Sequence, residues 1–143
     1  MAASILVVDD EAAIRTSLRS ILEDEGYEVS VAANGVEALK IYGTDPPDLM
    51  ILDIWMPEMD GLEFLERMQG LRGDLPVIVQ TAQGSIETVI KAMRAGADDF
   101  VVKPVSPERL RISMQNLLKV NALTEEVKRL NKKVGGSLTF DDL

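Results

Sequence analysis

The sequence predicts an α/β fold in which five parallel strands form one doubly wound sheet between five helices. Short apolar runs alternate with segments of helical periodicity along the chain. Three of these runs are apolar at successive residues, which is typical of inner strands that helices cover on both faces. Polar residues follow most of the runs, as expected at the ligand-binding carboxyl edge of an open sheet. A length of 143 residues suits one domain of this kind.

The predicted strands occupy 5–8, 27–32, 49–52, 77–80 and 100–102. The second run alternates apolar and polar residues, so we place it at an edge of the sheet. The helices between the strands carry apolar residues at helical spacing, and Gly26 and Gly96 stand where a left-handed residue would end two of them. Ser106 and Pro107 are typical of an N-cap and a first helical residue, and they begin the last helix.

The last helix is expected to leave the domain. From residue 107 to residue 134 it would be about 42 Å long at 1.5 Å per residue. Its distal half has apolar residues at alternating steps of three and four, a pattern of short parallel coiled coils. A solvated linker helix with a weak apolar stripe is the alternative. The residues of the stripe are Val120, Leu123, Val127, Leu130 and Val134.

Composition excludes several kinds of chemistry. The chain has no histidine and no cysteine, so it has no thiolate nucleophile, no imidazole base and no zinc site of the usual ligands. The formal net charge of −9 argues against a nucleic-acid surface or an anionic membrane as a partner. No apolar run is long enough for a membrane span, and we expect a cytoplasmic protein.

Polar side chains follow four of the five predicted strands. Asp9 and Asp10 follow the first run, Asp53 the third, Thr81 the fourth and Lys103 the fifth. Three neighbouring aspartates repel one another unless a cation neutralises them, and oxygen ligands without histidine or cysteine favour Mg²⁺. Such a magnesium site commonly takes phosphate oxygens as well, and a lysine beside it can hold a phosphate. As alternatives, Asp10 is a helix N-cap and Lys103 a simple ion-pair partner.

Five separated motifs occur in order along the chain: Asp9-Asp10-Glu11, Leu52-Asp53-Ile54-Trp55-Met56-Pro57 with Asp60-Gly61, Thr81-Ala82, Gly96-Ala97-Asp98-Asp99-Phe100 and Lys103-Pro104. Together they resemble the receiver domain of bacterial two-component response regulators, over about residues 4–120. The resemblance implies a flavodoxin-like strand order, 2-1-3-4-5.

The resemblance implies a role for each site residue. Asp53 would accept a phosphoryl group from a sensor histidine kinase and form an acyl phosphate. Asp10 and Asp53 would bind Mg²⁺ directly, Asp9 largely through water, and the main-chain carbonyl of Trp55 would complete the protein ligands. Lys103 and Thr81 would each contact a phosphoryl oxygen. The domain would regulate and would catalyse only its own phosphorylation and dephosphorylation.

The resemblance also implies a switch. Thr81 would move toward the phosphoryl group, and Phe100 would turn inward and alter the face made by the fourth helix, fifth strand and fifth helix. An ordinary core aromatic is the alternative for Phe100. The family pattern further implies a cis bond between Lys103 and Pro104.

Two less typical residues should flank the entrance to the site. These are Trp55, two residues after the acceptor, and Gln83, two residues after Thr81. A bulky tryptophan there predicts slow self-dephosphorylation, unless Trp55 simply packs on the adjacent loop.

After the linker helix the chain continues with Gly135-Gly136 and then Leu138-Thr139-Phe140-Asp141-Asp142-Leu143. This tail resembles the junction to an AAA+ domain in nitrogen-regulator-type activators that work with sigma-54. We therefore expect a receiver domain at 1–120, a helical linker at 121–136 and the first residues of an absent AAA+ domain at 137–143. Dimerisation would use the fourth-helix, fifth-strand and fifth-helix face, the linker, or both, and would control transcription.

Two other functions remain open. A haloacid-dehalogenase-type phosphatase also uses Mg²⁺ and an aspartyl nucleophile, but its general-acid position holds Trp55 here. A flavodoxin-like flavin protein shares the topology, but the acidic residues after the first strand would repel a flavin phosphate.

Overall fold

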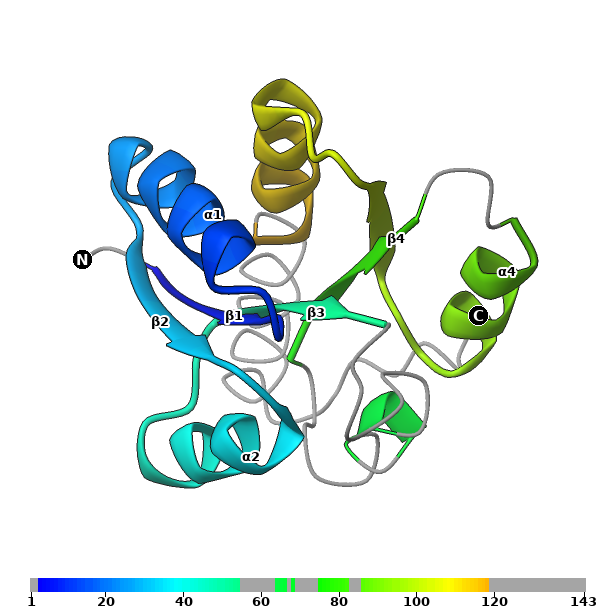
Figure 1. The fold of residues 1–143 in the computed structure, drawn as a ribbon, viewed down its shortest axis with the longest axis horizontal. Helices are drawn as coiled ribbons and strands as arrows, with labels where there is room; N and C mark the ends of the chain where they lie inside the picture. Colours follow the sequence, from blue (N-terminus) through cyan, green and yellow to red (C-terminus); the bar gives the residue numbers. More distant parts are fainter. Residues whose placement is uncertain (1–2, 55–63, 67, 69–74, 83–85, 119–143) are drawn as a thin grey trace, which may run out of the picture.

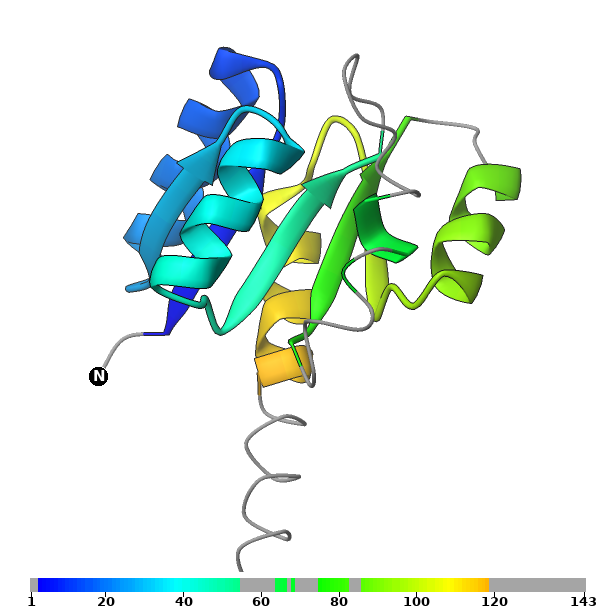
Figure 2. The ribbon, with the colours of Figure 1, turned by 90° about the horizontal axis from the view of Figure 1, so that it is seen from below.

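The computed structural model describes residues 3–54, 64–66, 68, 75–82 and 86–118. Its five strands are all parallel and lie in the order β2-β1-β3-β4-β5, which confirms the predicted sheet and the edge position of β2. Figure 2 shows the strands running side by side in one direction. Their bounds are β1 (Ser4–Val8), β2 (Glu28–Ala32), β3 (Leu49–Asp53), β4 (Val77–Thr81) and β5 (Asp99–Val102).

Helices cover both faces of the sheet, and each of the five predicted helices is represented among the described residues. Three have full bounds: α1 (Ala12–Asp24), α2 (Gly35–Thr44) and α4 (Ile86–Arg94). Helical residues also occur at 64–66 and at 107–118. In Figure 1, α1 and the helix 107–118 lie on one side of the sheet, and α2 and the turn at 64–66 lie on the other.

Strand alternation divides the buried apolar side chains into two cores. One core joins α1 and the helix 107–118 to the sheet face that carries Ile5, Val7, Leu49, Ile51, Ile78 and Val101. The other lies on the opposite face, where α2, α4 and the side chains of Phe64, Leu65 and Met68 pack on Leu6, Val8, Met50, Leu52, Val77 and Val79. Both faces of the inner strands are therefore buried, as their continuous apolar sequences predict.

Local sequence explains where the elements begin and end. Gly26 and Gly96 have φ of +92° and +109°, a left-handed conformation that glycine adopts without a steric penalty, and each follows a helix as predicted. At the start of α2, the Asn34 side chain accepts from the Glu37 amide, and the Glu37 carboxylate accepts from the amide of residue 33. The predicted linker and tail, 121–143, lie outside the described residues.

Candidate functional site

The carboxyl ends of β1, β3, β4 and β5 deliver four polar side chains to one face of the sheet. β3 ends on Asp53 and β4 on Thr81, one residue later than the apolar runs indicate. The hydrogen-bond pattern of the sheet continues one residue beyond β1 and β5. The Asp9 amide donates to the Ala32 carbonyl, and the Lys103 amide donates to the Thr81 carbonyl. Alternation then places Asp9, Asp53, Gln80 and Lys103 on the α1 face, above its apolar layers.

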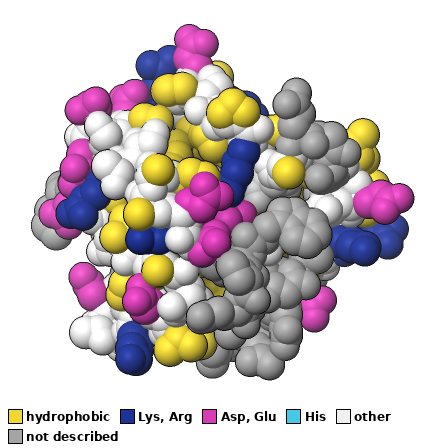
Figure 3. Space-filling model, viewed as in Figure 1, with side chains coloured by type: hydrophobic (Ala, Val, Ile, Leu, Met, Phe, Trp, Pro, Cys, Tyr) yellow, Lys and Arg dark blue, Asp and Glu magenta, His cyan; other side chains and the backbone are white. Residues whose placement is uncertain are grey.

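An ammonium lies between two buried carboxylates. Lys103 Nζ is 3.1 Å from Asp53 Oδ2 and 3.4 Å from Asp9 Oδ2. Asp9 and Asp53 are 0% and 1% exposed, whereas the Lys103 side chain is 22% exposed. Figure 3 shows acidic side chains beside a basic one near the middle of this face of the molecule. Ionised carboxylates at such depth require a partner of opposite charge, and Lys103 supplies it.

Burial alone would lower the pKa of the Lys103 ammonium. The hydrogen bonds and charges of Asp53 and Asp9 outweigh that effect, so the pKa of Lys103 lies above its usual value. Lys103 is therefore a fixed positive charge at neutral pH.

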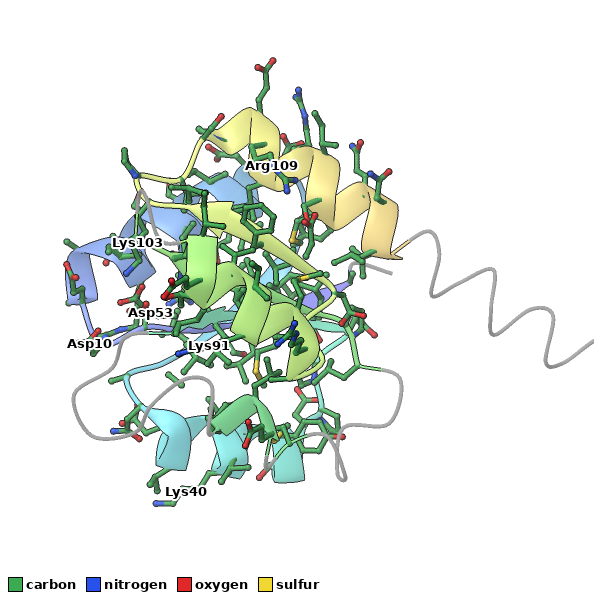
Figure 4. The ribbon with its side chains drawn as sticks, turned by 90° about the vertical axis from the view of Figure 1, so that its right-hand side faces the viewer. Asp10, Lys40, Asp53, Lys91, Lys103 and Arg109 are labelled. Atoms are coloured by element: carbon green, nitrogen blue, oxygen red, sulfur yellow. The ribbon has the colours of Figure 1, made fainter. Side chains whose placement is uncertain are left out.

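Asp10 completes an acidic cluster. Asp9, Asp10 and Asp53 each present a carboxylate oxygen, and the three oxygens lie within 4.8 Å of one another. Asp10 is exposed, and Figure 4 shows it with Asp53 and Lys103 at one edge of the molecule. A set of hard oxygen ligands with one exposed member fits Mg²⁺, which keeps several water molecules in protein sites. These three residues can hold a divalent cation.

Thr81 lies at the end of β4 but faces the other side of the sheet from Gln80. Its hydroxyl is buried, and it has no hydrogen-bond partner among the described residues. A buried hydroxyl in that condition is an available donor at the rim of the site.

Phe100 is partly buried against the core on the α2 and α4 face. The Arg109 guanidinium lies 5.9 Å from the centre of its ring, donates to the Phe100 carbonyl at 2.9 Å and pairs with Asp99 at 3.0 Å. Phe100 lies on β5, the strand that Lys103 follows directly.

Two residues that donate hydrogen bonds to Asp9 were not predicted as site residues. Gln80 donates to Asp9 Oδ2 at 3.2 Å, and Arg15 donates to the Asp9 carbonyl at 2.7 Å. The amide of Gln80 directly after three apolar strand residues is a signal that could have identified it, because a buried amide needs a partner. No such pattern distinguishes Arg15 from other helix-surface charges. Trp55 and Gln83 lie outside the described residues, and the Lys103–Pro104 bond is cis.

A hollow of about 430 Å³ lies beside the cluster. α1 contributes Ala13, Ile14, Ser17, Leu18 and Ile21 to it, and Gln80, Lys103, Pro104 and Val105 form the rest of its lining. Because most of these side chains are apolar, the chemistry of the site lies in the adjacent carboxylates and Lys103 rather than in this hollow.

Residues 5–115 match the family model described as "Response regulator receiver domain". The chain belongs to the response regulator receiver family. The response regulator MprA of Mycobacterium tuberculosis is 44% identical over 119 residues, which are 83% of this chain and 52% of the relative. MprA of Mycobacterium ulcerans is 40% identical over 143 residues, which are the whole chain and 60% of the relative.

Solved structures of receiver proteins have the same fold. NtrX from Brucella abortus has a TM-score of 0.89 and 40% identity, over 97% of this chain and 32% of NtrX. The separate receiver domain of that NtrX has a TM-score of 0.78 and 39% identity, over 80% of this chain and 98% of the domain. A CheY-like receiver protein from Methanospirillum hungatei gives 0.81 and 36%, over 87% of this chain and 99% of that protein.

These similarities bear on the wider predictions. The receiver family is regulatory, and the match does not support the phosphatase alternative. The chain spans about half the length of the first curated relatives that it matches. Within the described residues, no helix has both the length and the apolar composition needed to cross a bilayer.

Proposed function

We propose that this receiver domain takes a phosphoryl group onto Asp53 and so switches a surface for a downstream output. The observation that carries the proposal is the buried Asp53 carboxylate, with Lys103 Nζ 3.1 Å away and two further aspartates within 4.8 Å. A carboxylate oxygen of Asp53 would attack phosphorus. The bond from phosphorus to the donor atom would break, and the donor would leave with its electron pair.

The chain's own residues account for most of the chemistry. Asp9, Asp10, Asp53 and the Trp55 carbonyl would hold Mg²⁺, which when bound neutralises negative charge on the phosphoryl oxygens. Lys103 would turn from Asp9 and Asp53 toward one phosphoryl oxygen. The Thr81 hydroxyl would donate to another, which its present lack of a partner supports.

A sensor histidine kinase is the proposed phosphodonor. The sequence has no histidine, so a phosphohistidine donor would have to lie outside these 143 residues. The protein would act in the cytoplasm, as the sequence predicts. Trp55 and Gln83 would then limit access of water to the acyl phosphate and make its hydrolysis slow.

The proposed output surface consists of α4, β5 and the helix 107–118. On α4 the side chains of Ile86, Ile90 and Met93 are 72%, 47% and 41% exposed, and Val102 of β5 is 38% exposed. Movement of Thr81 and Phe100 would rearrange this surface and favour or disfavour a homodimer. Exposed apolar residues of this kind support a protein interface.

We also propose that the domain works within a longer transcription activator of the sigma-54 type. Structures of NtrX from Brucella abortus include complexes with ADP and ATP, and this chain covers about a third of NtrX. An AAA+ domain after a linker at 121–136 would account for a chain of that length. Two copies of the linker helix would pair through its apolar stripe, which consists of Val120, Leu123, Val127, Leu130 and Val134.

The test is incubation with Mg²⁺ and acetyl phosphate, followed by intact mass spectrometry. We expect the addition of one phosphoryl group, and we expect Asp53→Ala to abolish it. Asp45→Asn is the matched control, because Asp45 lies between α2 and the amino end of β3, whereas Asp53 lies at the carboxyl end of that strand. Labelling that persists in Asp53→Ala would refute the assignment.

A second experiment addresses the output. Sedimentation with and without beryllofluoride should reveal a change in the fraction of dimer. Ile90→Asp in α4 should prevent that change, and an unchanged dimer fraction in the native protein would refute the proposed surface.

A further inference from the structure

Gln80 is a buried polar residue in a strand whose other side chains up to it are apolar. It is 0% exposed and lies on the α1 face, directly above Ile78 on the same strand. In the sheet register it pairs with Asp53 across β3 and β4. The amide therefore occupies the same layer as the carboxylates.

Its contacts are directed at Asp9. Gln80 Nε2 donates to Asp9 Oδ2 at 3.2 Å, and the Glu11 amide donates to Asp9 Oδ1 at 2.9 Å. Lys103 Nζ also contacts Asp9 Oδ2, at 3.4 Å, but it lies closer to Asp53. The Asp9 carboxylate is thus held from β4, from the loop before α1 and from the end of β5.

The donors differ in what else they contact. Lys103 is shared between two carboxylates, whereas the Gln80 amide nitrogen makes no other hydrogen bond recorded among the described residues. Gln80 Oε1 is buried and has no partner in that same part of the chain. An unsatisfied buried acceptor is unfavourable, so an apolar side chain would suit the packing better. The Gln80 amide therefore contributes to the site through its Nε2 donor.

We propose that Gln80 is a positioning residue that keeps the Asp9 carboxylate aimed at the metal site, independently of Lys103. This rests on the proposed function, in which Lys103 turns toward a phosphoryl oxygen. Asp9 then loses its charged partner and keeps the donors from Gln80 and Glu11. Residues that orient a ligand group through hydrogen bonds commonly change metal affinity by about 10- to 100-fold.

The test is a calorimetric titration of the protein with Mg²⁺ alone, without phosphodonor. Gln80→Met removes both amide atoms at similar volume, and we expect it to weaken Mg²⁺ binding about tenfold. Ile78→Val is the matched control, since it alters the same face of β4 one layer below the site. We expect that variant to lose stability and to bind Mg²⁺ as the native protein does.

A double-mutant cycle distinguishes positioning from general damage. If Gln80 acts through Asp9, Gln80→Met should change Mg²⁺ affinity by less than twofold when Asp9 is already asparagine. An equal change in both backgrounds would overturn the proposal, and so would native affinity in a folded Gln80→Met protein.

A measurement on the native side chain covers the case in which Gln80→Met does not fold. The side-chain amide protons of Gln80 should exchange slowly in nuclear magnetic resonance spectra of the native protein. They should exchange faster in Asp9→Asn, and unchanged exchange there would also overturn the proposal. Native protein that binds no Mg²⁺ would instead contradict the proposed function.

Discussion

Replacement of Lys103 by methionine tests the central electrostatic argument. The substitution removes the one ammonium that contacts both Asp9 and Asp53 in the described part of the chain, and it preserves most of the aliphatic side chain. Two carboxylates that are almost fully buried then lose their charged partner. We expect the free energy of unfolding to fall strongly in buffer without Mg²⁺, and much less when Mg²⁺ is present.

The magnitude follows from the distances. At an effective dielectric constant of about 20, unit charges 3.1 Å apart attract by roughly 5 kcal/mol. Desolvation of the ammonium offsets part of this attraction, and breaking a buried ion pair typically costs about 3–5 kcal/mol. Because the Lys103 side chain is 22% exposed, we expect a loss near the lower end, about 3 kcal/mol.

Bound Mg²⁺ would neutralise the same carboxylates, so the loss should shrink to about 1 kcal/mol at saturating Mg²⁺. By linkage, a difference of about 2 kcal/mol means that the variant binds Mg²⁺ roughly 30-fold more tightly than the native protein. Phosphorylation of Asp53 should nevertheless fall, because Lys103 no longer contacts the phosphoryl group.

The assay is urea unfolding followed by circular dichroism, with and without Mg²⁺. Lys40→Met removes the same charge from α2, and Figure 4 shows Lys40 far from Asp53 and Lys103. That control should change the free energy of unfolding by no more than about 0.5 kcal/mol. Equal losses for Lys103→Met with and without Mg²⁺ would refute the reasoning, because the metal and the ammonium would then not act on the same carboxylates.

Three further predictions follow from other contacts. Thr81→Ala should change the free energy of unfolding by less than about 1 kcal/mol, because the hydroxyl has no partner among the described residues. The same substitution should slow phosphoryl labelling of Asp53 on the order of 100-fold. Normal labelling kinetics would argue against a role of the Thr81 hydroxyl in the reaction. Burial would raise the pKa of the Asp99 carboxyl, but hydrogen bonds from Arg109 and Ser113 outweigh it and leave the pKa below its usual value. The stability that Asp99 contributes is therefore complete above about pH 4 and lost as pH falls through the lowered pKa, so urea unfolding between about pH 2 and pH 6 should show a smaller slope in Asp99→Asn. Trp55→Ala should shorten the lifetime of the acyl phosphate, measured by loss of the added mass; a native half-life of seconds that the substitution leaves unchanged would remove Trp55 from the mechanism.

The sequence predicted the strand ends well because both signals there are local. Continuous apolar runs identified the buried strands, and a polar residue after four of the five runs marked the rim where Asp9, Asp53 and Lys103 meet. Parallel strands share one carboxyl edge, so proximity followed from topology alone.

The contacts of Gln80 and Arg109 could not be predicted in the same way. Gln80 was assigned to the strand, but its choice of Asp9 depends on which face of β4 it occupies. Since both faces are apolar, the hydrophobic pattern does not distinguish them. Arg109 meets Phe100 and Asp99 only because the helix 107–118 returns along β5, and that return depends on tertiary packing.

The two buried faces of β4 have a consequence for how strand alignment is specified. A slip of β4 by one residue would leave every apolar side chain in an apolar environment, so hydrophobic burial would oppose it only weakly. A slip in one direction would, however, bring Thr81 to the position of Gln80, withdraw the amide donor from Asp9 and put a shorter hydroxyl side chain in its place. The polar ends of the strands therefore do more than hold a site. They mark the one alignment, among several of similar burial, in which the carboxylates are satisfied.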